Sequence, residues 1–296
     1  MSLLLKGAFT ALITPFDHDG QVDHDALRAL VRRQIDGGID GLVPCGTTGE
    51  AATMSDEECL AVIETVVDEA DGEVPIIAGT GTNNTAQTVE FTRRVADMGG
   101  VDAALVVTPY YNKPGQPELT RHFQTVADEG GLPVVLYNVP GRTAVSLSAD
   151  TVAHLAEHDQ IIAIKEASAD MALDSAIVAS TPDDFALLSG DDFTTLPLLS
   201  VGGVGCVSVA SNLIPGHMSK LCELANHGDF AAARDIHLPL QSLADALFQK
   251  TNPIPVKAAA SLLDLCDIHL RAPLYAPDDA YLQNLQALLT EHPLLT

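Results

Sequence analysis

The chain has no tryptophan, and phenylalanine and tyrosine together make up only 4% of its 296 residues. It has few cysteines, and none of them forms a Cys-x-x-Cys pair: Cys45, Cys59, Cys206, Cys222 and Cys266. An odd number of scattered cysteines predicts structural thiols in a reducing compartment. Hydrophobic residues reach 47%, which is enough for a large core. However, no apolar run approaches the roughly 20 residues that cross a membrane.

Positive charge is also scarce. There are 15 lysines and arginines against 40 acidic residues, which gives a formal net charge of −25. Such a chain repels nucleic acids and anionic membranes, so neither is expected as a partner. The acids are spread over many short segments such as 17–19 and 56–58, a pattern typical of a solvated surface. Self-repulsion destabilises a compact state unless salt screens it, so we expect a halophilic source.

No targeting segment is indicated at the start of the chain. The apolar stretch within Met1–Lys6 is shorter than the core of a secretory signal, and its lysine follows the stretch instead of preceding it. Together with the thiol pattern, this predicts a cytoplasmic protein.

Short apolar runs alternate with helical periodicity through most of the chain. Eight runs read as strands: 7–13, 39–45, 74–79, 101–107, 133–138, 161–165, 185–190 and 204–210. Helices are predicted between them, for example over 23–36, 56–69 and 148–157, with Ser55 and Ser148 as N-caps. This order predicts a (β/α)8 TIM barrel. The alternative is a doubly wound open sheet, but no glycine-rich phosphate turn follows the first strand.

The strand pattern stops near residue 225. Three helices are predicted after it, over 229–249, 255–265 and 278–289. We therefore expect a catalytic barrel over 1–225 and a C-terminal helical segment over 226–296.

Lys165 is the most informative single residue. It ends the β-branched run 161–164, which is typical of a buried strand. Burial at a strand end disfavours the ammonium form and favours the neutral amine. A neutral amine is a nucleophile toward carbonyls, so this is where an imine-forming enzyme would carry one. The alternative is a lysine that extends past the strand end to the surface.

In barrels of this kind the functional side chains follow the strands. Three of the five tyrosines, Tyr110, Tyr111 and Tyr137, fall at strand ends, which favours a pocket lined by hydroxyls. The Gly46–Gly49 turn could hold a small carboxylate on its backbone N–H groups, helped by the dipole of the next helix. Arg142 could clamp a second carboxylate in bidentate fashion, and a surface salt bridge is its alternative role.

Two further motifs are weaker. His154 and His158 belong to a His-x-x-Glu-His pattern found in zinc peptidases. That pattern falls in the helix before the Lys165 strand, at the wrong end of a barrel and without a third ligand. Residues 79–84 begin like a dinucleotide-binding fingerprint, but Asn84 replaces its last glycine. We expect a turn into the next helix there.

Taken together, the strand ends resemble those of the dihydrodipicolinate synthase and N-acetylneuraminate lyase family of class I aldolases. The resemblance runs from about Gly7 to Pro277. The motifs that carry it are Gly46–Glu50, Thr108–Asn112, Tyr137–Thr143, Ile164–Ala167, Leu188–Asp192 and Asn252–Lys257. The resemblance implies a barrel with a C-terminal helical segment, commonly a homotetramer built as a dimer of dimers.

It also implies roles for particular residues. Lys165 would form a Schiff base with pyruvate, so that no metal or organic cofactor is needed. Tyr137 would move protons at the reacting carbon, with Thr48 and Tyr111 as a hydroxyl relay. In relatives the equivalent of Tyr111 reaches in from a neighbouring subunit. The backbone at Thr47 and Thr48 would hold the pyruvate carboxylate.

The resemblance adds pocket residues and a second substrate. Val207, through its carbonyl, and Gly190 would line the pyruvate pocket. Arg142 would bind the carboxylate of aspartate semialdehyde. The Gly141–Thr143 loop resembles the synthases, so the expected product is the dihydrodipicolinate precursor of lysine. A 2-keto-3-deoxygluconate-type aldolase and a non-catalytic pyruvate-binding barrel are the alternatives.

The lysine-inhibited relatives carry a serine, histidines and a glutamate at their regulatory site. Positions here that resemble that site hold Ala51, Asp56, Cys59 and Gln87, while Asn83 and Tyr110 are kept. Loss of the glutamate removes the ion-pair partner of the lysine α-amine, so weak or absent feedback inhibition is predicted.

Overall fold

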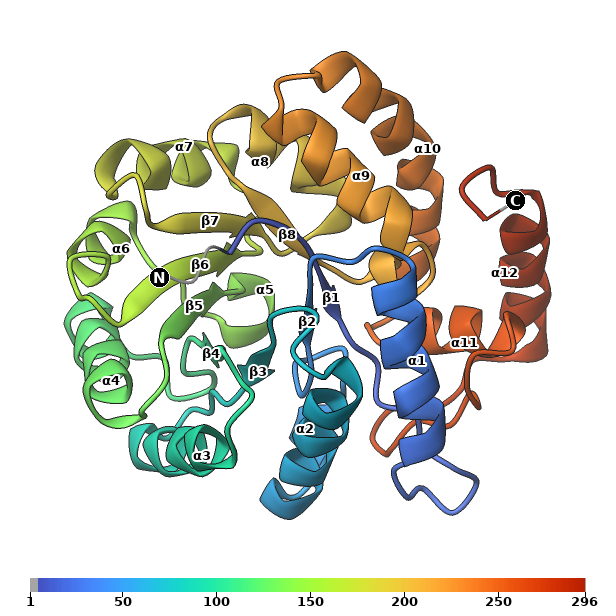
Figure 1. Ribbon diagram of the computed structural model, residues 1–296, viewed down its shortest axis with the longest axis horizontal. Coiled ribbons are helices and arrows are strands. Elements are labelled where there is room, and N and C mark those ends of the chain that lie inside the picture. The colour runs from blue at the N-terminus through green and yellow to red at the C-terminus, as the bar shows by residue number, and fades with distance from the viewer. Residues whose placement is uncertain (1–4, 296) are drawn as a thin grey trace.

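Eight parallel strands form a ring in the computed structural model, which describes residues 5–295 (Figure 1). The strand order is β2-β1-β8-β7-β6-β5-β4-β3, and a parallel bridge between Leu42 and Ile76 joins the two ends. The strands are β1 Gly7–Ala11, β2 Gly41–Val43, β3 Ile77–Gly79, β4 Ala103–Val107, β5 Val134–Asn138, β6 Ile161–Glu166, β7 Ala186–Ser189 and β8 Gly205–Ser208. The predicted barrel is confirmed, and the open sheet is wrong.

Most strands are shorter than their apolar runs. The second run predicted a strand over 39–45, but β2 ends at Val43 because Cys45 adopts the left-handed conformation with φ 55°. A positive φ is incompatible with a strand. The chain therefore leaves the barrel earlier than its hydrophobicity suggests, and the residues that follow form the loop above the barrel.

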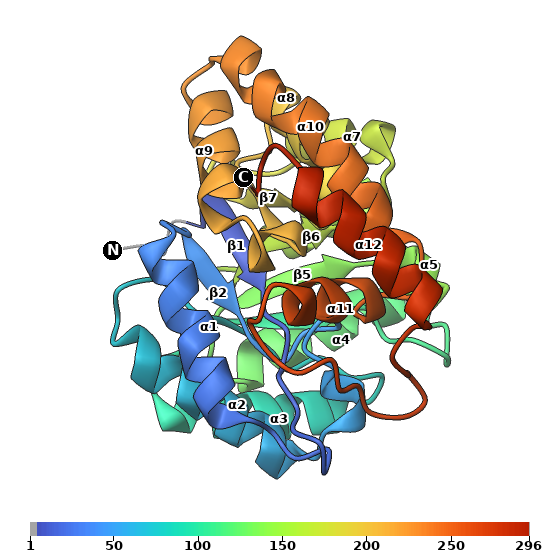
Figure 2. The ribbon, with the colours of Figure 1, turned by 90° about the vertical axis from the view of Figure 1, so that its right-hand side faces the viewer.

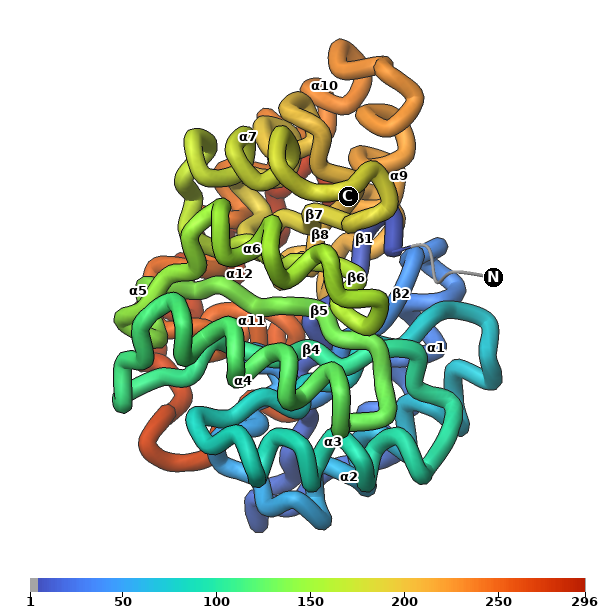
Figure 3. The backbone as a smooth tube through the Cα atoms, turned by 90° about the vertical axis from the view of Figure 1, so that its left-hand side faces the viewer, coloured from blue at the N-terminus to red at the C-terminus, as the bar shows by residue number. Residues whose placement is uncertain are grey.

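Helices cover the outside of the barrel. They are α1 His24–Asp36, α2 Asp56–Ala70, α3 Thr85–Met98, α4 Gln116–Glu129, α6 Ala149–Leu155, α7 Met171–Ser180, α8 Thr195–Ser200 and α9 Pro215–Asn226, with the single turn α5 Pro140–Thr143. Short 3₁₀ turns occur at η1 Ala51–Thr53, η2 Asp192–Thr194 and η3 Ala210–Asn212. Figure 3 shows α3, α4 and α6 side by side along one flank.

The predicted helix starts are confirmed by their caps. Ser55 accepts from the Glu58 N–H while the Glu58 carboxylate accepts from the Ser55 N–H, which is a complete capping box. Ser148 caps α6, and Asn84 caps α3. The glycine-rich stretch before Asn84 is thus a turn into a helix, as expected.

The hydrophobic core has two layers. One lies between the barrel and its helices. The other fills the barrel with inward-facing side chains from most strands, including Phe9, Val43, Leu105, Val135 and Ala163. Because side chains alternate along a strand, the position two residues after Ala163 also faces inward. That position is Lys165.

The C-terminal segment contains α10 Phe230–Phe248, α11 Ile254–Leu262 and α12 Asp279–Glu291, as the sequence predicted (Figure 2). It is tied to the barrel by polar contacts. The Arg271 guanidinium donates to the Gly20 and Thr53 carbonyls, and Lys257 pairs with Glu50. The division into 1–225 and 226–296 stays a prediction, although the eighth outer helix, α9, ends at Asn226.

Within residues 5–295, no helix is both long and apolar enough to cross a membrane. Residues 1–4, which belong to the N-terminal stretch judged too short for a signal, lie outside the described part of the chain.

Candidate active site

Lys165 and Tyr137 are neighbours inside the barrel. They are paired residues on the adjacent strands β6 and β5, so both side chains point to the same face. The Lys165 Nζ lies 4.3 Å from the centroid of the Tyr137 ring. Lys165 is only 6% exposed and Tyr137 only 7%. Among residues 5–295, Lys165 forms no ion pair. The amine is therefore enclosed beside a phenol, and the surface-lysine alternative is wrong.

The residue after Lys165 points the other way and anchors the strand end. Glu166 accepts hydrogen bonds from Asn138 Nδ2 at 2.7 Å and from the Ser168 N–H at 2.6 Å. Asn138 in turn accepts from the Leu147 N–H. Burial raises the pKa of Glu166. These contacts fix the ends of β5 and β6 relative to each other, and so they hold Tyr137 and Lys165 in register.

Two aspartates, Asp191 and Asp192, follow β7, which pairs with the Lys165 strand β6 on the side opposite β5. Burial raises the pKa of Asp191 to about 6, although the nearby Lys165 acts in the opposite direction. Asp192 is fully buried and accepts from the Ser208 hydroxyl at 2.5 Å and from the Ala210 N–H at 2.9 Å. Asp192 thereby fixes the backbone after β8. Both aspartates belong to the Leu188–Asp192 motif, but no role was predicted for either of them.

Gly190 and Val207 line the same region. The Gly190 N–H donates to the Glu166 carbonyl at 2.7 Å. A Cβ at Gly190 would lie 2.6 Å from the Ala167 Cβ, so a side chain cannot be accommodated without a shift. Val207 is 1% exposed and contributes its side chain to the cluster inside the barrel. Gly190 therefore leaves no room for a side chain, and the Val207 side chain belongs to the packed interior of the barrel.

The Thr47–Glu50 turn lies above β2. The Glu50 N–H donates to the Thr47 carbonyl at 3.1 Å, and the buried Thr14 hydroxyl donates to the Gly49 carbonyl at 2.7 Å. Thr48 is 3% exposed, and its Oγ1 accepts from Asn252 Nδ2 at 3.0 Å. Within residues 5–295, no hydrogen bond joins the Thr48 hydroxyl to Tyr137 or Tyr111.

A buried ion pair also ties the turn to α11 of the C-terminal segment. Lys257 Nζ lies 2.6 Å from Glu50 Oε1, and the Arg271 N–H donates to Glu50 Oε2 at 3.0 Å. Glu50 has φ 55°, an unfavourable backbone conformation for a residue with a side chain. No local pattern predicts these contacts, because the two charged residues are 207 positions apart in the chain.

Arg142 sits on α5, next to the strand that carries Tyr137. Its Nη2 donates to the Asn252 carbonyl at 3.3 Å. It is exposed, and it forms no ion pair with any carboxylate in the described chain. The surface salt bridge considered for it is not seen. The guanidinium is thus available at the mouth of the barrel to an anion.

Tyr111 is not brought to the other site residues within one chain. It is 89% exposed, and its φ is 72°. A bulky side chain at positive φ is a strained arrangement that clusters at functional sites. The neighbouring backbone is fixed by Asn83, which donates to the Tyr110 carbonyl at 3.1 Å. The loop therefore presents an aromatic ring outward in a defined position.

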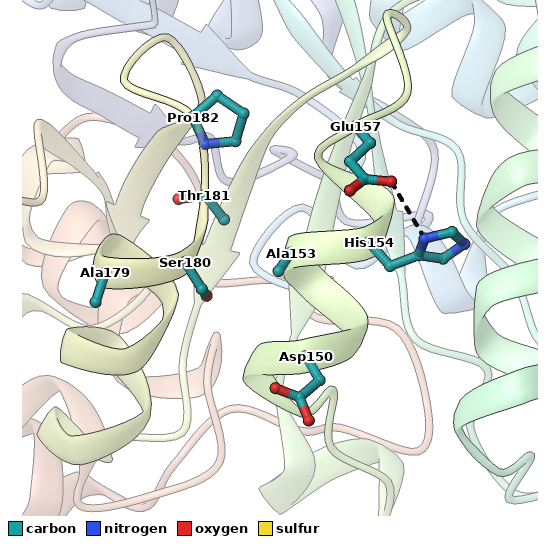
Figure 4. Close-up of a pocket in the computed structure, with 8 residues that line it drawn as sticks. All are labelled: Asp150, Ala153, His154, Glu157, Ala179, Ser180, Thr181 and Pro182. Carbon is teal, nitrogen blue, oxygen red and sulfur yellow. Dashed lines mark ion pairs between the residues drawn. The ribbon is translucent and has the colours of Figure 1, made fainter.

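The two histidines of the zinc-peptidase pattern contact different carboxylates. His154 pairs with Glu157 at 3.5 Å, whereas His158 turns away to Asp128 at 3.0 Å. No cluster of three or more metal-ligating side chains occurs in residues 5–295. His154 and Glu157 instead border an open groove between α6 and α7, on the outside of the barrel (Figure 4). None of the candidate site residues lines this groove.

A closed (β/α)8 barrel with a buried lysine beside a tyrosine at neighbouring strand ends is the arrangement expected of a class I aldolase. The family model described as the dihydrodipicolinate synthetase family matches residues 4–292. The chain belongs to that family.

Relatives with assigned names agree with this. A 4-hydroxy-tetrahydrodipicolinate synthase of Pelobacter propionicus is 45% identical over 292 residues, which is 99% of this chain and 100% of the relative. The corresponding synthase of Magnetococcus marinus is 50% identical over 94% of both chains. Among solved structures, dihydrodipicolinate synthase from Aquifex aeolicus has a TM-score of 0.95 at 43% identity, covering 98% of this chain and 99% of that one.

Proposed function

We propose that this enzyme condenses pyruvate with L-aspartate 4-semialdehyde to give 4-hydroxy-tetrahydrodipicolinate, the precursor of diaminopimelate and lysine. The observation that carries the proposal is the enclosed amine of Lys165, 4.3 Å from the Tyr137 ring. The family membership and the names of the relatives support the same reaction.

Lys165 supplies the covalent step. Its amine attacks the keto carbon of pyruvate, and loss of water with uptake of one proton leaves a protonated imine. The imine withdraws electrons, so the pyruvate methyl group loses a proton and becomes an enamine. The enamine carbon attacks the aldehyde of the second substrate. Attack of that substrate's amine on the imine carbon then closes the ring and releases Lys165. Since the imine is the electron sink, no metal or organic cofactor is required.

Tyr137 moves the protons at the reacting carbon, because its phenol is the acid or base group beside Lys165. Thr48 and Tyr111 complete the hydroxyl relay. The backbone of Thr47 and Thr48 holds the pyruvate carboxylate, since the turn ends directly above the barrel. The Val207 carbonyl and Gly190 complete the pyruvate pocket. A side chain at Gly190 would collide with Ala167, which supports a pocket shaped for a small keto acid.

Arg142 selects the second substrate. Its guanidinium has no carboxylate partner within residues 5–295, and it lies on the turn that follows the Tyr137 strand. A bidentate bond to the carboxylate of aspartate semialdehyde uses this free cation. Glyceraldehyde, the substrate of a 2-keto-3-deoxygluconate-type aldolase, has no such carboxylate. The unpaired arginine therefore favours the synthase.

The relay requires a second subunit if Tyr111 is to take part. Tyr111 is 89% exposed and strained, as expected for a ring that completes the site of a neighbouring copy. We propose a homotetramer arranged as a dimer of dimers. One solved relative, 37% identical, is described as a monomeric dihydrodipicolinate synthase variant, so sedimentation of this chain is a necessary check.

We place the enzyme in the cytoplasm of a halophilic source. All five cysteines are free thiols, and four of them are buried, which fits a reducing compartment. The net charge of −25 fits a solution rich in salt.

Borohydride trapping tests the covalent step. With pyruvate present, reduction should add one pyruvate-derived unit to Lys165, as located by peptide mass spectrometry. Lys165→Ala should abolish the adduct. Lys220→Ala, which removes an exposed lysine of α9, is the matched control and should leave the adduct intact. Trapping on another lysine, or none in the unsubstituted enzyme, would overturn the proposal.

Rate measurements test the second substrate. Turnover with pyruvate and aspartate semialdehyde should exceed turnover with pyruvate and glyceraldehyde. Arg142→Ala should raise the KM for aspartate semialdehyde while leaving pyruvate trapping unchanged. If glyceraldehyde were the better substrate, the aldolase would replace the synthase as the assigned function. If neither aldehyde reacted although pyruvate is trapped, the chain would be a non-catalytic pyruvate-binding barrel.

A further inference from the structure

Asn252 connects two loops that the proposed reaction uses. It lies just before α11 and is only 6% exposed. Its Nδ2 donates to Thr48 Oγ1 at 3.0 Å, and its carbonyl accepts from Arg142 Nη2 at 3.3 Å. One residue of the C-terminal segment thus touches both the turn assigned to pyruvate and the arginine assigned to the aldehyde.

The donor and acceptor of the hydrogen bond between Asn252 and Thr48 are fixed. An amide nitrogen can only donate, so the Thr48 hydroxyl oxygen must accept at this bond. Its own hydrogen is then left to donate to a different acceptor. Among the described residues, the Asn252 amide is the only hydrogen-bond partner of that hydroxyl. The hydrogen is therefore available to a substrate carboxylate or to the phenolic oxygen of Tyr137.

Folding stability alone does not favour this arrangement. Within residues 5–295, the Asn252 Oδ1 is buried and accepts no hydrogen bond. A buried polar atom without a partner is destabilising, and such groups are uncommon in native proteins. A smaller or apolar residue would avoid this cost. The amide is thus better explained by what its nitrogen does to Thr48.

The position of Asn252 is set by a second contact five residues further on, inside α11. Lys257, on α11, pairs with Glu50 in the same turn that carries Thr48. The side chains of Lys257 and Glu50 are 0% and 1% exposed. A buried, hydrogen-bonded ion pair between two elements fixes their separation closely. The distance from Asn252 to Thr48 is therefore held by the fold rather than by the surface of a mobile loop.

We propose that Asn252 is a positioning residue that sets the direction of the Thr48 hydroxyl, an inference that rests on the proposed function. Asn252→Asp tests the direction, because it keeps the shape and replaces the donor with an acceptor. The Thr48 hydroxyl then donates to the carboxylate, and its hydrogen is withdrawn from the substrate. Asn252→Ala removes the donor without adding charge, and it serves if the aspartate variant does not fold.

The measurement is the pyruvate dependence of borohydride trapping, together with steady-state kcat and KM. Asn252→Asp should lower kcat/KM for pyruvate by about 10- to 100-fold, the range for one lost site hydrogen bond. Saturating pyruvate should still label Lys165. Asn226→Asp is the control. It makes the same change at a half-buried amide that donates to the Val204 carbonyl at 3.0 Å, and it should leave both readouts unchanged.

A double-mutant cycle separates positioning from general damage. Thr48→Val removes the hydroxyl and keeps the shape. If Asn252 acts through Thr48, Asn252→Ala combined with Thr48→Val should be no worse than Thr48→Val alone. Fully additive losses would overturn the inference and leave the proposed function standing. So would an Asn252→Asp enzyme whose trapping depends on pyruvate concentration in the same way as that of the unsubstituted enzyme. Failure of the unsubstituted enzyme to trap pyruvate would remove both.

Discussion

The buried pair between Lys257 and Glu50 gives the sharpest test of how the C-terminal segment is held. The two side chains are 0% and 1% exposed, and the Lys257 Nζ also donates to the His269 carbonyl at 2.7 Å. Burial lowers the pKa of Lys257, and Glu50 opposes that shift. The Lys257 ammonium is therefore stabilised by the Glu50 carboxylate, and the carboxylate is stabilised by the ammonium, in a place that water does not reach.

Lys257→Met removes the charge and keeps a long apolar side chain. It leaves the Glu50 carboxylate buried and without its cation, which costs about 3–5 kcal/mol of unfolding free energy. One kcal/mol moves the midpoint of a domain of this general size by about 2–4 °C, so a fall of roughly 6–20 °C is expected. Adding Glu50→Gln to Lys257→Met should recover part of the loss, because the stranded charge is then gone. Thermal unfolding followed by circular dichroism at neutral pH measures the unsubstituted protein and both variants.

Lys220→Met is the matched control. Lys220 pairs with Glu223 at 2.8 Å, but the two side chains are 52% and 53% exposed, and water replaces the lost partner. No measurable change is expected. If Lys257→Met melted at the same temperature as Lys220→Met, the reasoning from burial would be refuted. A double variant less stable than Lys257→Met alone would show that Glu50 is not the stranded group.

Three further predictions concern charge. Burial, with Glu166 nearby, raises the pKa of Asp174 to about 7 from its usual 3.8, so its contribution to stability is lost as pH rises between those values. The gain in melting temperature from Asp174→Asn should therefore grow up to about pH 7 and then stay constant; a gain independent of pH would contradict this. Because the net charge is −25, raising KCl from about 0.1 to 2 M should raise both the melting temperature and the activity; full activity retained in salt-free buffer would exclude salt adaptation. Submillimolar L-lysine should leave the rate unchanged in a coupled assay, since the glutamate that pairs with the lysine α-amine in inhibited relatives is not kept here, and strong inhibition would refute this.

Much of the fold followed from local pattern. Alternating apolar runs and capped helices were sufficient for the eight units, because period and capping depend on residues a few positions apart. Strand lengths were less well predicted. The run at 39–45 gave only β2 Gly41–Val43, since a single left-handed residue, Cys45, ends the strand without changing its hydrophobicity.

Some residues of the candidate site were also recognisable from local sequence, and others were not. The motif at Lys165 and the tyrosine at Tyr137 were recognisable, because each ends an apolar strand and strand ends of a barrel meet at one rim. The roles assigned to Thr47, Thr48 and Tyr111 remain predictions for the trapping and rate experiments.

The sequence by itself determined the barrel, the place of Lys165 at a strand end and the family to which the chain belongs, all of which are encoded in short contiguous segments. Only the tertiary structure decided that Lys165 is enclosed beside Tyr137. It alone also showed that Glu50 is paired with Lys257, and that Asn252 reaches Thr48 across 204 residues. The physical reason is that burial and hydrogen-bond partners depend on which surfaces the folded chain brings together, and no local pattern records residues that meet from opposite ends of the sequence.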